Sequence, residues 1–68
     1  MRSRLTNRAD NAPEPVSIRY AREHAGLTQT EAAALVHTSC RAWQQWESGD
    51  RTMHPGLWEL FRIKARKP

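Results

Sequence analysis

The chain has 68 residues, one cysteine and a formal net charge of +4, from 11 basic and 7 acidic residues. A chain of this length makes one small domain, and a single cysteine excludes an internal disulfide, so the core must hold unaided or share its burial with a second copy. The basic balance favours a polyanionic partner. Neither a signal peptide nor the roughly 20 apolar residues of a membrane span is found, so we expect a cytoplasmic protein with no membrane contact.

Both ends of the chain are basic and polar. Residues 1–15 contain Pro13 and Pro15 and little to bury, which predicts a flexible arm ahead of a globular domain over residues 16–68. Two interpretations stay open for the charges at the ends: contact with phosphates, or solvated ends that keep the protein soluble. These charges are Arg2, Arg4 and Arg8 in the arm and Arg62, Lys64, Arg66 and Lys67 at the other end.

A first helix is predicted to begin near Ser17, a good N-cap, and to run to Ala25. Gly26 is expected to end it in the left-handed conformation. Thr28 followed by Glu31 is a capping-box pattern, in which the threonine hydroxyl and the glutamate carboxylate each satisfy a backbone amide of the other residue. This pattern predicts that a second helix begins there.

A tight turn and a third helix follow. His37 and Thr38 are predicted to make the turn, Ser39 to cap the third helix, and Gly49 to end it. Trp43 and Trp46 are three residues apart, so they share one face of this helix, which we assign to the core. Two short helices joined by a tight turn have the layout of a helix-turn-helix, whose second helix enters a DNA major groove.

A fourth helix is predicted from about Gly56 to Lys64, with Pro55 in its first turn. Its apolar residues occupy more than one face, which indicates burial on more than one side. One side is expected to seal the core through Leu57 and Leu60 or Phe61. The remainder is predicted to form the interface of a two-fold homodimer: Trp58, Phe61 and Ile63. The fold is therefore predicted to be all-α, a compact four-helix helix-turn-helix domain.

Over about residues 18–63 the chain resembles the lambda-repressor/Cro-like (Xre) helix-turn-helix domains. The shared residues, in order and spacing, are Thr28, Gln29, Glu31, Ala33, Val36, Ser39, a large inward residue at 43, Trp46, Glu47 and Gly49. The segment from Arg41 to Gly49, followed by His54 and Pro55, looks most like the anti-CRISPR-associated (Aca) repressors. Those are small phage or mobile-element proteins that bind inverted repeats in a promoter and shut down their own operon. One departure is His37, which stands where the family often has a glycine with positive φ.

The resemblance implies roles for individual residues. Bases would be read by Arg41, which can grip guanine O6 and N7, and by Gln44 and Gln45, which match the adenine N6/N7 edge. A structural ion pair is implied between Arg22 and Glu47. The alternative for the exposed arginine and glutamines is an ordinary solvated helix face. The expected contacts to DNA phosphates are Thr28, Gln29, Ser39 and Arg51.

The function implied is a non-enzymatic repressor that binds double-stranded DNA as a homodimer, at an inverted repeat with half-sites one helical turn, roughly 34 Å, apart. Two alternatives stay open: a protein-interaction module such as an antitoxin, and an RNA-binding module. No metal, cofactor or small-molecule ligand is expected, because the three histidines and Cys40 match no zinc signature and Cys40 has no evident base partner.

Overall fold

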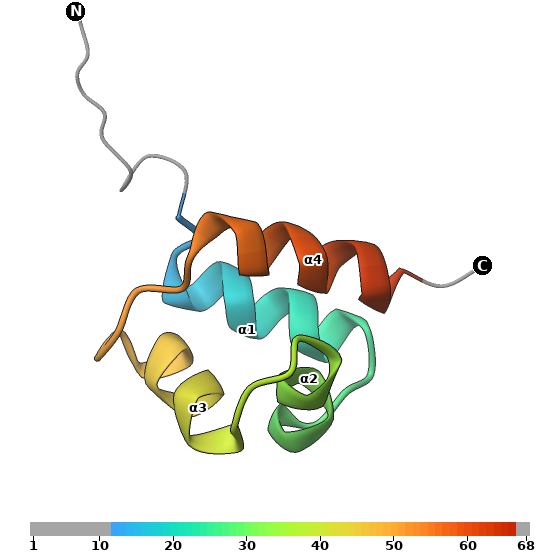
Figure 1. Ribbon diagram of the computed structural model, residues 1–68, viewed down its shortest axis with the longest axis horizontal. Helices are drawn as coiled ribbons and strands as arrows, with labels where there is room; N and C mark the ends of the chain where they lie inside the picture. The colour runs from blue at the N-terminus through green and yellow to red at the C-terminus, as the bar shows by residue number, and fades with distance from the viewer. Residues whose placement is uncertain (1–11, 67–68) are drawn as a thin grey trace, which may run out of the picture.

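A computed structural model describes residues 12–66, and all the regular structure in that range is helical (Figure 1). The four helices are α1 (Pro15–His24), α2 (Gln29–Leu35), α3 (Cys40–Ser48) and α4 (Pro55–Ala65). The predicted all-α, four-helix fold is confirmed. The described residues do not include residues 1–11 of the predicted arm, which contain Arg2, Arg4 and Arg8. Lys67, at the other end of the chain, also lies outside them. Within residues 12–66, none of the helices is long and apolar enough to cross a membrane.

Helix α1 begins two residues before the predicted cap at Ser17. Its N-cap is Glu14, whose carbonyl accepts hydrogen bonds from the backbone N–H groups of Ser17 at 2.9 Å and Ile18 at 3.1 Å. Pro15 occupies the first helical position, where its fixed φ suits the helix and its missing N–H costs nothing. The helix ends at His24, and Gly26 then adopts a left-handed φ of 76° as predicted.

The capping box of α2 is formed as predicted. Thr28 Oγ1 accepts from the Glu31 N–H at 3.1 Å, and Glu31 Oε1 accepts from the Thr28 N–H at 2.9 Å. After α2, His37 adopts a left-handed φ of 61°, the conformation that the family often gives to a glycine. The chain then enters α3 through the cap at Ser39, whose Oγ accepts from the Ala42 N–H at 3.1 Å.

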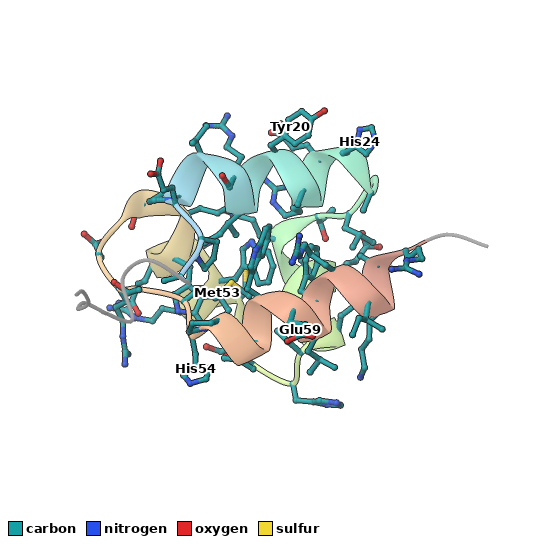
Figure 2. The ribbon with its side chains drawn as sticks, turned by 90° about the horizontal axis from the view of Figure 1, so that it is seen from above. Tyr20, His24, Met53, His54 and Glu59 are labelled. Atoms are coloured by element: carbon teal, nitrogen blue, oxygen red, sulfur yellow. The ribbon has the colours of Figure 1, made fainter. Side chains whose placement is uncertain are left out.

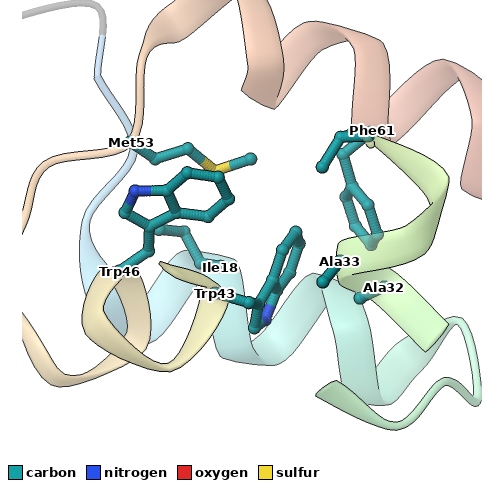
Figure 3. Packing of buried hydrophobic residues seen from close by; sticks show 8 residues of the cluster. Ile18, Ala32, Ala33, Trp43, Trp46, Met53 and Phe61 are labelled. Carbon is teal, nitrogen blue, oxygen red and sulfur yellow. The ribbon is translucent and has the colours of Figure 1, made fainter. Parts of the chain in front are cut away.

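Aromatic rings fill the centre of the domain (Figure 3). Trp43 is fully buried, with its ring centroid 5.5 Å from that of Trp46 and 4.9 Å from that of Phe61. Ala32 and Ala33 are buried on α2, and their small side chains let α3 pack closely against that helix. Met53, in the loop before α4, is also fully buried, although the sequence pattern placed it only in a loop.

Helix α4 extends one residue beyond the predicted range at each end, and it packs against α2, with Phe61 reaching Trp43 of α3. Its N-cap is His54, whose Nδ1 accepts from the Gly56 N–H at 2.8 Å. Phe61 points into the core and is 0% exposed, so its assignment to an exposed dimer face is corrected. The sequence pattern left Phe61 open to either side, core or interface, because α4 carries a wide apolar arc and only packing decides which part faces inward.

Candidate nucleic-acid interface

One polar stripe runs along the outward side of α3. It follows the i, i+3, i+4, i+7 spacing of one helical face, and its residues are Arg41, Gln44, Gln45 and Ser48. Together with Asp50, these residues line a shallow polar hollow. Arg41 and Gln44 are exposed, and Gln45 is half-buried. The opposite side of the same helix carries the two buried tryptophans, which fix how α3 is rotated. The structure therefore brings the three predicted base-reading residues together on one accessible surface.

Behind that stripe, the Glu47 carboxylate collects hydrogen bonds from three elements. Arg22 of α1 donates from Nε at 2.6 Å and from Nη2 at 3.3 Å, so the ion pair implied by the resemblance is present. Trp43 donates its indole N–H at 2.6 Å and Gln29 its amide at 3.1 Å. The side chains of Arg22 and Glu47 are only 14% and 7% exposed. This network joins α1, α2 and α3 and holds α3 at a fixed angle to the rest of the domain.

The network also changes the protonation of its charged members. Burial alone raises the pKa of the Glu47 carboxyl, but the hydrogen bonds from Arg22, Trp43 and Gln29 and the charge of Arg22 outweigh that effect, so the pKa is lowered. The hydrogen bond to Glu47 raises the pKa of Arg22, against the opposing effect of burial. Both groups are therefore held in their charged forms, and the Glu47 carboxyl stays ionised to a lower pH than an ordinary glutamate.

A family model described as a helix-turn-helix domain matches residues 17–61. The chain belongs to the helix-turn-helix domain family. This match supports the resemblance to the lambda-repressor/Cro-like domains. The chain is also similar to the type II methyltransferase M.MspI of Moraxella sp., with 34% identity over 53 residues, which is 78% of this chain and 13% of that relative. The chain thus spans a small part of the curated relative that it matches.

In this helix-turn-helix domain, the predicted phosphate contact Gln29 is engaged within the protein. Its Nε2 donates to Glu47, and its Oε1 accepts from Gln44 Nε2 at 3.4 Å. Gln29 thus links the buried carboxylate to a predicted base-reading side chain. No local pattern could predict this link, because Gln29 and Gln44 are 15 positions apart and meet only where α2 crosses α3.

The other predicted phosphate contacts lie at the ends of α2 and α3. Thr28 and Ser39 each use the hydroxyl oxygen to cap a helix, which leaves the hydroxyl proton free to be donated to a phosphate oxygen. Arg51 is exposed in the loop after α3, and its N–H donates to the Gln45 carbonyl at 3.2 Å. Thr28 and Ser39 thus stand at the starts of α2 and α3, and Arg51 follows the end of α3.

The residues predicted for a dimer interface are only partly accessible in the helix-turn-helix domain. Ile63 is 58% exposed. Trp58 is half-buried, with the Arg62 guanidinium 5.2 Å from its ring centroid and the Phe61 ring stacked at 6.3 Å. Of the three, Ile63 offers the largest exposed fraction to a second copy of the chain.

Proposed function

We propose that this chain is a sequence-specific DNA-binding transcriptional repressor whose helix α3 enters the major groove of its operator. The observation that carries the proposal is the stripe of Arg41, Gln44 and Gln45 on α3, set on the side opposite the buried tryptophans. These side chains have the hydrogen-bonding groups that distinguish base pairs in the major groove. The buried Glu47 network supports the proposal because it holds the stripe rigidly before DNA arrives.

In this proposal each side chain has a distinct part. The Arg41 guanidinium donates two hydrogen bonds to guanine O6 and N7, and the Gln44 amide donates to N7 and accepts from N6 of adenine. Gln45 lies one position along the same stripe and contacts the neighbouring base pair. The hydroxyls of Thr28 and Ser39 and the Arg51 side chain bind phosphates and set the register of α3, with Gln29 close by.

We further propose that the chain acts as a homodimer on an inverted repeat. A two-fold dimer presents two copies of α3 to successive major grooves on one side of the duplex, which requires half-sites about 10–11 bp apart. The exposed Ile63 and the half-buried Trp58 on α4 support a role for this helix in the interface. Sedimentation of the protein with and without DNA tests this, and Ile63→Lys should shift it towards a monomer.

Bound at a promoter, such a dimer represses by blocking access to the DNA. The resemblance of residues 41–55 to the anti-CRISPR-associated repressors supports autoregulation of an anti-CRISPR or other phage or mobile-element operon. We propose no catalytic role for the chain. The similarity to a type II methyltransferase covers 13% of that protein, and the proposal takes only the helix-turn-helix segment from it.

The test is a titration against the DNA upstream of the chain's own gene, with a scrambled duplex as the control and the salt concentration varied. We expect tight binding that requires the inverted repeat and is lost in Arg41→Ala. Arg19→Ala is the matched variant, because it removes an exposed arginine from α1, away from the stripe, and should bind like the wild type. Equal binding of the scrambled duplex that vanishes with salt would contradict the proposal.

A further inference from the structure

The loop after α3 places a carboxylate on the reading stripe. Gly49 has a left-handed φ of 89° and turns the chain back on itself. The Asp50 N–H donates to Ser48 Oγ at 3.3 Å, and Ser48 Oγ donates to the Gln45 carbonyl at 3.1 Å. Asp50 is thereby held against the last turn of α3, where it lines the same hollow as Arg41 and Gln44.

The Asp50 carboxylate is exposed, and no residue in the described range of 12–66 pairs with it. The ion pairs among residues 12–66 are Arg19–Glu23, Arg22–Glu23 and Arg22–Glu47, and none includes Asp50. Its carboxylate oxygens accept no hydrogen bond from any residue in that range, since only its backbone N–H is used. The Ser48 hydroxyl, by contrast, is already used in the two hydrogen bonds that hold the turn. The base-reading residues predicted from the sequence included neither Ser48 nor Asp50. Of these two, Asp50 is the one whose side chain keeps free hydrogen-bonding capacity among residues 12–66.

A carboxylate is out of place on a surface that serves only to attract phosphates, because it repels them. It can, however, accept a hydrogen bond from the N4 amino group of cytosine at the floor of the major groove. Seen along α3, the stripe then changes in chemistry from the donor fork of Arg41, through the amides of Gln44 and Gln45, to the acceptor Asp50.

We propose that Asp50 is a specificity-determining residue that selects a cytosine in each half-site. This rests on the proposed DNA-binding function and adds to it the order of bases along the groove. Arg41 and Ser48 are seven residues apart, about 10 Å along a helix of 1.5 Å rise per residue, and Asp50 lies at the end of that span. With base pairs spaced about 3.4 Å apart, the cytosine falls about three to four base pairs from the guanine read by Arg41.

The experiment is selection of binding sites from a duplex library with a randomised centre, carried out with the wild type, Arg41→Ala, Asp50→Asn and Glu59→Gln. Glu59 is the matched control because it is an exposed carboxylate on α4, away from the hollow (Figure 2). Asp50→Asn and Glu59→Gln each remove one negative charge, and because Glu59 lies off the stripe, its loss should strengthen DNA binding less than the loss of the Asp50 charge does. Thermal melting of the four proteins checks that they fold alike.

We expect the wild type to select a cytosine at that spacing from the guanine whose selection is lost in Arg41→Ala. Asp50→Asn should lower the preference for cytosine by roughly fivefold or more and favour adenine there, because asparagine pairs with the adenine edge. Glu59→Gln should keep the wild-type preference. An unchanged base preference in Asp50→Asn, with all duplexes bound more tightly, would show that Asp50 acts only through its charge and overturn the inference.

Failure of the inference can be told apart from failure of the proposed function. If the wild type selects an inverted repeat that lacks a cytosine at this spacing, the assignment of Asp50 falls and the repressor proposal stands. If the wild type selects no sequence at all, both fall together.

Discussion

Gln44 on α3 donates a hydrogen bond to Gln29 on α2 over 3.4 Å, while Gln29 donates to the buried Glu47 at 3.1 Å. Because a carboxylate can only accept, Glu47 fixes which end of the Gln29 amide faces inward, and the Gln29 oxygen is left facing Gln44. The NH2 group of Gln44 donates its hydrogen bond to that oxygen. The Gln44 oxygen and its second N–H stay available, which is the donor–acceptor pair that an adenine edge requires.

Gln29→Ala should therefore weaken the discrimination for adenine. The difference in binding free energy between the operator and a duplex with that adenine replaced should shrink by about 1 kcal/mol, because Gln44 loses its orientation. The measurement is a pair of titrations on the two duplexes. Ala34→Ser, an exposed change on the same helix, is the control. If Gln29→Ala weakened both duplexes equally, Gln29 would serve only as the phosphate contact predicted from the sequence.

Glu47→Gln should destabilise the fold. The change leaves the Arg22 guanidinium in a largely buried position without its counter-charge, and such losses cost about 3–5 kcal/mol. Urea titration followed by tryptophan fluorescence measures the effect directly, since Trp43 itself donates to Glu47.

The matched control for that variant is Glu23→Gln. Glu23 pairs with Arg19 at 3.2 Å and also lies 3.8 Å from Arg22, but its side chain is exposed, and exposed i, i+4 pairs contribute only about 0.3–0.5 kcal/mol, so the loss in this variant should be small. Melting of Glu47→Gln at the wild-type temperature would show that the ion pair does not hold α3 in place.

Acid should remove the contribution of Glu47. A carboxyl whose folded pKa is lowered stabilises the fold fully above its unfolded pKa and loses that effect as the pH falls through the folded pKa. The pKa of Glu47 lies below the ordinary value of 4.5, so the loss begins near that pH and continues below it. We expect the stability difference between the wild type and Glu47→Gln to be constant near neutrality and to shrink in this acidic range. A difference that stayed constant throughout would place the folded pKa of Glu47 at its unfolded value.

Local signals in the sequence predicted most of the fold. The capping box of Thr28 and Glu31 and the left-handed Gly26 and Gly49 each depend on a few neighbouring residues, so their outcome can be read from the chain itself. The start of α1 was missed because Ser17 is a good cap in isolation, whereas the proline two positions earlier had already begun the helix.

Features that depend on how the helices pack could not be read in this way. The inward direction of Phe61 and the burial of Met53 follow from the rotation of α4 and the path of the loop before it. The contact between Gln29 and Gln44 exists because α2 and α3 cross at that point, and the place of Asp50 on the stripe depends on hydrogen bonds within the turn. The proposed base-reading face could be predicted from the sequence because the two tryptophans fix the opposite side of α3.

His37→Gly should stabilise the domain. His37 has a left-handed φ of 61°, which costs a residue with a Cβ roughly 1–2 kcal/mol, whereas glycine adopts it freely. Glycine also gains freedom in the unfolded chain, which offsets about 0.5–1 kcal/mol, so we expect a net gain of about 0.5–1 kcal/mol in thermal or urea unfolding. The Lys64 contact to His37, at 3.3 Å, is exposed and its loss should matter little. Gly49→Ala provides the opposite change, since its φ of 89° strains any residue with a Cβ. A loss of stability in His37→Gly would mean that the imidazole holds the turn through its contact with Lys64, and Lys64→Ala would then show the same loss.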